Sequence, residues 1–132
     1  MPSIFSKIIK REIPAHIVAE DDNYLAFLDI NPLMEGHCLA IPKVDIDYIY
    51  DLDDETLAGL HLFAKKVALG IQAAIPCERI AVSVLGLEVP HAHVHLIPMN
   101  NMEDANFARP KLKPTQEELA ATARKIKSAI QA

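Results

Sequence analysis

The stretch Pro90–Met99 reads PHAHVHLIPM and carries three of the six histidines of the chain. These histidines stand at every second position: His91, His93 and His95. Successive side chains of an extended strand point to opposite faces, so the pattern predicts a strand with the three imidazoles on one face. The other face would be apolar: Ala92, Val94 and Leu96. One histidine is often only a satisfied core or surface residue, whereas three in register indicate a chemical function.

Two uses of such a row compete. A metal site needs imidazole nitrogens that converge at about 2.0 to 2.1 Å from one ion, and neighbours on one flat strand diverge. The chain also has no His-Glu-x-x-His motif. A nucleophile needs less geometry, because an imidazole with a pKa of about 6.5 keeps a free lone pair near neutral pH. His93, the middle ring, is the natural nucleophile, and His91 and His95 could donate hydrogen bonds to phosphate oxygens and to the leaving group.

Composition sets the class of protein. The chain has 132 residues and is 51% hydrophobic, which predicts one domain spanning residues 1–132. Its net charge is −5 and its 13 Lys and Arg residues are scattered, which argues against a nucleic acid polymer as partner but permits a small phosphorylated ligand. Cys38 and Cys77 lack a metal-like spacing and are expected to be reduced. Charges interrupt the N-terminal apolar residues and no stretch is long enough for a bilayer, so a cytoplasmic protein without membrane contact is expected.

The N-terminal half predicts a helix and three strands. Ser3 can cap a helix over residues 4–11. Residues 15–20 and 24–29 form a predicted hairpin around the turn residues 21–23. A third strand, residues 37–41, follows Gly36 and begins with His37 at a loop edge, where active-site residues often lie.

The C-terminal half predicts two longer helices and two strands. Asp53 is the expected N-cap of an amphipathic helix that runs to about residue 75. A fourth strand, residues 79–85, precedes the histidine strand as its antiparallel neighbour. Thr115 and Glu118 form a capping box for the last helix, after a polar loop. The predicted fold class is therefore α+β, with a five-stranded antiparallel sheet, two main helices and a short N-terminal helix.

The motif from His91 to Ile97 resembles the His-φ-His-φ-His-φ-φ signature of the histidine-triad (HIT) family of nucleotide hydrolases and transferases, where φ is an apolar residue. Further blocks in the same order resemble the bacterial, phosphoramidase-like branch of that family: IFSKII at residues 4–9, AFLDI at residues 26–30, Gly36-His37 and Ile41-Pro42-Lys43. The resemblance implies a HIT-like fold with the helices on one side of the sheet. It also implies a homodimer, a small nucleotide substrate, and no metal or other cofactor.

The resemblance assigns roles residue by residue. It makes His93 the nucleophile that forms a nucleotidyl-histidine intermediate, with His91 and His95 orienting it and contacting phosphate, and His37 as an auxiliary histidine. The family's base and ribose pocket maps onto six residues: Ile4, Phe5, Ile8, Phe27, Asp29 and Ile30. The loop before the triad departs from the family pattern, since Leu87 and Glu88 stand where the family places polar residues near the scissile phosphate. Met99-Asn100-Asn101 also replaces the Gly-Gly-Arg that follows the triad in that branch.

The favoured function is therefore cleavage of a P–N, P–O or P–S bond to a nucleoside monophosphate. The enzyme would resemble a purine nucleoside phosphoramidase or a dinucleoside polyphosphate hydrolase. Two alternatives stay open: a nucleotide-binding regulatory protein with weak turnover, and a hydrolase with a histidine-ligated metal.

Overall fold

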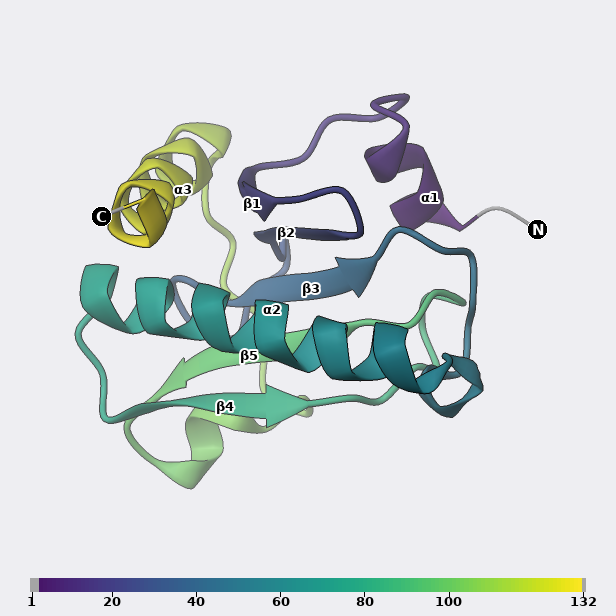
Figure 1. Ribbon diagram of the computed structural model, residues 1–132. Coiled ribbons are helices and arrows are strands. Elements are labelled where there is room, and N and C mark those ends of the chain that lie inside the picture. Colours follow the sequence, from purple (N-terminus) through teal and green to yellow (C-terminus); the bar gives the residue numbers. More distant parts are fainter. Residues whose placement is uncertain (1–2, 132) are drawn as a thin grey trace.

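The computed structural model describes residues 3–131 (Figure 1). Along the chain lie α1 (Ile4–Ile9), β1 (Ile17–Glu20), β2 (Tyr24–Leu28), β3 (Cys38–Pro42), α2 (Asp54–Ala74), β4 (Arg79–Ser83), β5 (Val94–Met99) and α3 (Gln116–Gln131). Single turns of 3-10 helix follow β3 and β5, at Ile49–Asp51 and Met102–Ala105. The five strands form one antiparallel sheet in the order β1-β2-β3-β5-β4. The predicted α+β class, with its five strands, two main helices and short N-terminal helix, is confirmed.

Local side-chain hydrogen bonds set the ends of the elements. Asp21 closes the β1–β2 turn by accepting the N–H groups of Asn23 and Tyr24, both at 2.8 Å. Asp53 accepts the Thr56 N–H at 2.7 Å and caps α2 as predicted. Thr115 and Glu118 exchange side-chain to backbone hydrogen bonds at 2.9 and 3.1 Å, which is the predicted capping box of α3.

The first helix is shorter than predicted. Ser3 caps it as expected, because its side chain accepts the Ser6 N–H. The helix ends at Ile9 rather than at residue 11. Arg11 adopts a φ of +63°, a left-handed conformation that no helical residue can take.

The sheet is covered on both faces, so the expectation of helices on one side only is wrong for α1. Alternate residues of β2 divide between two cores: Tyr24, Ala26 and Leu28 belong to the core that α2 and α3 cover. Leu25 and Phe27 belong to a second core that includes Phe5 and Ile8 of α1. All five residues of β2 and all five of β3 are buried, because both strands carry apolar side chains in both directions. This second face becomes the floor of the candidate site.

Two further observations concern the described residues. Cys38 and Cys77 are both free thiols, and Cys38 is completely buried. No helix within residues 3–131 combines the length and the apolar character needed to cross a membrane.

Candidate functional site

The histidine row only partly lies in a strand. β5 begins at Val94, so His95 belongs to the strand whereas His91 and His93 precede it. The predicted strand start at His91 is wrong because the backbone N–H of His91 bonds to Val89 and that of Ala92 bonds to Ile46, at 2.8 Å each, instead of to a neighbouring strand. The alternation itself holds. The apolar partners lie in the core covered by α2 and α3: Ala92, Val94 and Leu96.

His93 is held in one tautomer by its own chain. Its Nδ1 lies 2.7 Å from the carbonyl oxygen of His91, and a carbonyl can only accept. Nδ1 therefore carries the proton, and in the neutral ring Nε2 keeps a free lone pair. The ring of Phe5 meets that of His93 edge-on, with 5.2 Å between centroids. This arrangement gives His93 the electronic form that a nucleophile needs.

His91 is an internal residue. It is fully buried, with Nε2 at 2.9 Å from the Pro42 carbonyl oxygen and Nδ1 at 3.1 Å from Ser3 Oγ. Both ring nitrogens therefore have protein partners. Of the two roles expected for His91, this geometry is compatible with orienting the site and not with contacting phosphate.

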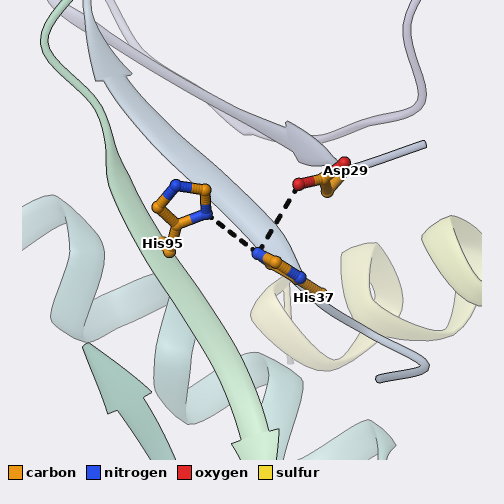
Figure 2. A group of neighbouring side chains, drawn as sticks. All are labelled: Asp29, His37 and His95. Atoms are coloured by element: carbon orange, nitrogen blue, oxygen red, sulfur yellow. Dashed lines mark hydrogen bonds and ion pairs between the residues drawn. The ribbon is translucent and has the colours of Figure 1, made fainter. Parts of the chain in front are cut away.

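His37 and His95 form a hydrogen-bonded pair with a defined proton (Figure 2). The Leu33 N–H points at His37 Nδ1, 3.1 Å away, so this nitrogen accepts and the proton of the neutral ring resides on Nε2. His37 Nε2 then donates to His95 Nδ1 at 3.0 Å, which leaves the proton of His95 on Nε2. Burial lowers the pKa of His37 to about 3 and that of His95 to about 4. Both rings are therefore neutral near pH 7, and His95 presents an N–H donor.

Asp29 lies at the end of this pair. Its Oδ2 is 3.6 Å from His37 Nε2, and its Oδ1 accepts the Asn31 N–H at 2.8 Å. Burial raises the pKa of the Asp29 carboxyl, and the nearby charge of Glu88 acts in the same direction. Ligand hydroxyl groups that donate to this carboxylate would favour its charged form.

Asp29, His37 and His95 each place one possible ligand atom within 4.8 Å of the others, close enough for the three atoms to share one metal ion. The proton positions do not suit a metal. A metal-bound histidine donates through its other ring nitrogen, whereas Nδ1 of His37 accepts from Leu33. The proton of the neutral His37 ring therefore lies on Nε2, the nitrogen that faces Asp29 and His95 in Figure 2. These residues therefore do not fit a metal ion.

A cavity of about 290 Å³ joins the predicted binding residues. Its lining includes Ile4, Phe5, Ile8, Phe27, Asp29, Ile30, Glu88, His93 and His95. Three predicted residues do not line it: His37, His91 and Leu87. Leu87 is 96% exposed and lines a different hollow of about 430 Å³, which also reaches His93.

Sequence reasoning missed several residues of the site. Ile13, Pro14 and Ala15 line the cavity in the connection from α1 to β1. Phe107 packs its ring against His95, with 4.8 Å between centroids, and lies in the loop that was expected only to connect. An isolated aromatic residue in a polar loop was the available signal.

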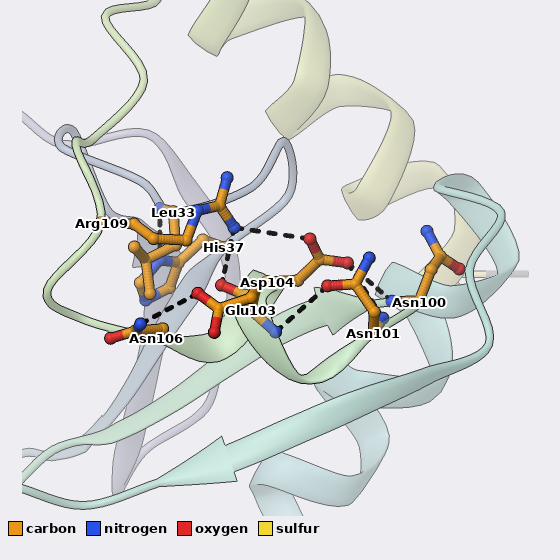
Figure 3. A network of polar contacts seen from close by, with 8 residues as sticks. All are labelled: Leu33, His37, Asn100, Asn101, Glu103, Asp104, Asn106 and Arg109. Atoms are coloured by element: carbon orange, nitrogen blue, oxygen red, sulfur yellow. Dashed lines mark hydrogen bonds and ion pairs between the residues drawn. The ribbon is translucent and has the colours of Figure 1, made fainter.

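A polar network fixes the loop that carries Phe107 (Figure 3). Asp104 accepts the backbone N–H of Asn100 at 2.8 Å, and Asn101 caps the following 3-10 turn. Arg109 Nη1 donates to the Glu103 carbonyl at 2.7 Å and lies 3.4 Å from Asp104. The network orders the loop from which Phe107 packs against the rings of His37 and His95.

Comparisons with known proteins show the family. A family profile described as "HIT domain" matches residues 10–102. The chain is 36% identical over 136 residues to the adenosine 5′-monophosphoramidase hnt1 of Schizosaccharomyces pombe, covering 98% of this chain and 99% of the relative.

Solved structures are similar over almost the whole chain. The crystal structure of a Hit-like protein of Bartonella henselae, described as involved in cell-cycle regulation, has a TM-score of 0.85 at 34% identity, covering 96% of this chain and 95% of that one. A zinc-bound histidine triad family protein of Mycobacterium smegmatis has a TM-score of 0.84 at 25% identity, covering 97% and 92%.

Proposed function

Because this chain belongs to the HIT-domain family, we propose that it hydrolyses or transfers nucleotides through a covalent nucleotidyl-histidine intermediate. The observation that carries the proposal is the hydrogen bond from His93 Nδ1 to the His91 carbonyl, 2.7 Å long, in a ring that lines the cavity. In the neutral ring it leaves the Nε2 lone pair free to attack phosphorus.

The reaction has two steps. His93 Nε2 forms a bond to the phosphorus of a nucleoside 5′-monophosphate derivative while the bond to the leaving group breaks. The Nε2–H of His95, whose position is fixed because Nδ1 accepts from His37, donates a hydrogen bond to the leaving group, which takes its proton from solvent water. Water then attacks the nucleotidyl-histidine, the N–P bond breaks, and the nucleoside monophosphate is released.

The cavity supports binding of the nucleoside. Phe5, Ile8 and Phe27 give it an apolar wall against which a base can pack. Asp29 can accept hydrogen bonds from both ribose hydroxyls, since a carboxylate is an acceptor at both oxygens.

Charge favours a leaving group that carries no phosphate. Asp29 and Glu88 both line the cavity, and within the described part of the chain no Lys or Arg lines it. A polyphosphate would bring several negative charges next to two carboxylates, whereas an amine would bring none. The proposed bond is therefore P–N, as in the substrate that names the S. pombe relative.

The test is brief incubation with an adenosine phosphoramidate, followed by mass spectrometry. We expect an adenylyl adduct on His93, and a loss of turnover by orders of magnitude in His93→Ala. His16→Ala is the control, because its ring bonds to Gln116, a residue of α3. Unchanged turnover in His93→Ala would overturn the proposal. Tight nucleotide binding by a wild type without turnover would instead favour a regulatory binding protein.

We also infer that a second copy of the chain binds along β4. This strand is an edge of the sheet, with backbone groups free to pair on its outer side. Val82 pairs with the buried Leu96 yet is 60% exposed, and Leu85 beyond it is 55% exposed. Antiparallel pairing of two β4 strands would extend the sheet and cover these side chains. Light scattering should give a dimer for the wild type and a monomer for Val82→Lys; a monomeric wild type would overturn this inference.

A further inference from the structure

Four polar side chains from three separate segments meet at the start of α1. Ser3 and Ser6 come from its cap and first turn, Asp45 follows β3, and His91 precedes β5. Ser3 Oγ lies 3.1 Å from His91 Nδ1, Ser6 Oγ donates to Asp45 Oδ1, and Asp45 Oδ1 lies 3.4 Å from His91 Nδ1. Ser3 and Ser6 are each 4% exposed and His91 is fully buried, whereas the Asp45 side chain is about half exposed.

The proton positions of this cluster follow from its partners. The Pro42 carbonyl oxygen can only accept, so His91 Nε2 carries the proton and donates to it. In the neutral ring, Nδ1 must then accept a hydrogen bond. Ser3 Oγ accepts the Ser6 N–H at 3.1 Å and keeps its own proton for His91 Nδ1. The hydroxyl group of Ser6 has one proton, and it donates this proton in the hydrogen bond to Asp45. Each buried polar group therefore has a partner, which orders the cluster.

The cluster connects the two halves of the candidate site. On one side, the His91 carbonyl accepts the Nδ1 proton of His93, and Ile46, next to Asp45, accepts the Ala92 N–H at 2.8 Å. On the other side, Ser3 and Ser6 hold α1, whose Phe5 lines the cavity beside His93. None of Ser3, Ser6 or Asp45 lines that cavity. They can act on a reaction only through the residues that they hold.

We propose that Ser3, Ser6 and Asp45 are positioning residues that keep the His93 ring aligned with the nucleoside wall of α1. The inference rests on the proposed nucleotide chemistry. Among the described residues, loss of the Asp45 link leaves only the Ser3–His91 hydrogen bond between α1 and the turn from His91 to His93, so the two segments can shift more easily relative to each other. A displacement of about 1 Å between reacting groups costs about 100-fold in rate.

Kinetics give the first test. Asp45→Ala removes the acceptor of Ser6 and should lower kcat for an adenosine phosphoramidate on the order of 10-fold to 100-fold, with a smaller change in KM. Asp45→Asn keeps an acceptor oxygen for Ser6 and should restore most of kcat. The double variant Ser6→Ala/Asp45→Ala should lose no more than either single variant, because the two residues act as one link. Asp22→Ala, an equal charge change at the exposed β1–β2 turn, is the control.

Imidazole ¹⁵N NMR gives a test that needs no substrate. The wild type should show the His93 ring protonated at Nδ1, and Asp45→Ala should show a mixture of tautomers with faster exchange of that proton. Melting temperatures establish that the variants are folded, which the half-exposed position of Asp45 favours. Unchanged kcat and unchanged His93 signals in Asp45→Ala would overturn the inference. A wild type without turnover would overturn the proposed function alone, and the NMR experiment would still decide whether the cluster orders His93.

Discussion

His37 and His95 lie 58 positions apart in the sequence, and their facing ring nitrogens are 3.0 Å apart. The donor in this pair is His37, because Leu33 occupies the other nitrogen of its ring. His95 thereby acquires a fixed tautomer from a residue that never reaches the cavity.

The His37→Ala variant should lower kcat on the order of 10-fold to 100-fold and leave KM nearly unchanged. Without the donor at Nδ1, His95 divides between two tautomers and no longer always presents its Nε2 proton to the leaving group. Steady-state kinetics with a phosphoramidate measure the effect, with His16→Ala as control. An equal loss in kcat and in nucleotide affinity would contradict the role of His37 in fixing the tautomer of His95.

Stability should fall with acid in a window set by the same two rings. Burial lowers the folded-state pKa of His37 to about 3 and of His95 to about 4, against 6.5 for the ordinary residue. Between about pH 4 and pH 6.5 the unfolded chain binds more protons than the folded chain, so stability is full above that window and is lost as pH falls through it. The raised pKa of Asp29 acts in the opposite direction, because the folded carboxyl keeps a proton at pH values where the unfolded one has lost it. Melting temperatures across this range should fall more steeply for the wild type than for His37→Ala; equal slopes would contradict the assignment.

Chelation should leave the activity unchanged. The proton on His37 Nε2 faces Asp29 and His95, so a metal there would have to displace a proton that the Leu33 N–H holds in place. Turnover after dialysis against EDTA should equal that before, and elemental analysis should find no stoichiometric zinc. Zinc at one equivalent with chelator-sensitive turnover would restore the metal-hydrolase alternative.

Gly36→Ala should destabilise the protein by more than Gly86→Ala does. Both glycines have positive φ, at +92° and +80°, which costs other residues about 1 to 2 kcal/mol. A Cβ at Gly36 would also lie 3.1 Å from Ile75 and 3.3 Å from Pro98, whereas one at Gly86 would meet nothing within 4 Å. Chemical denaturation of both variants measures the difference. Equal losses would show that space around Gly36 is not limiting.

Glu88→Gln should raise kcat/KM for dinucleoside polyphosphates more than for phosphoramidates. The change removes one of the two carboxylates that line the cavity, so it relieves repulsion mainly for the more highly charged substrate. The ratio of the two kcat/KM values, compared with that of Glu117→Gln, measures the effect. An unchanged ratio would show that Glu88 points away from the leaving group.

The sequence predicted the class of the fold and most of the cavity lining. Caps and turns such as Asp53, Asp21 and Thr115 act within a few residues, so their roles follow from local spacing. The residues that line the cavity were predicted from the family resemblance. Periodicity alone shows that α1 has an apolar face, but it does not show what that face packs against.

The start of β5 at Val94 and the face of the sheet that α1 covers could not be predicted in this way. The period-2 pattern from His91 indicated one continuous strand, but Ile46 takes the Ala92 N–H that a strand would use. The resemblance placed all helices on one face, whereas Phe5 and Ile8 pack against Phe27 on the other. The start of β5 depends on a hydrogen bond to Ile46, and the position of α1 depends on an apolar face of the sheet. Both partners lie far away in the sequence, so local patterns do not reveal them.

The sequence by itself determined that three imidazoles alternate with three core residues, because side-chain direction in an extended chain follows from local geometry. Only the tertiary structure decided what each imidazole does. His91 became an internal support, His93 keeps a free lone pair, and His95 receives a proton donor from His37. The physical reason is that a histidine's tautomer is set by the partner of its other nitrogen, and here those partners include the Pro42 carbonyl, the Ser3 hydroxyl and the Leu33 N–H, all brought close by folding.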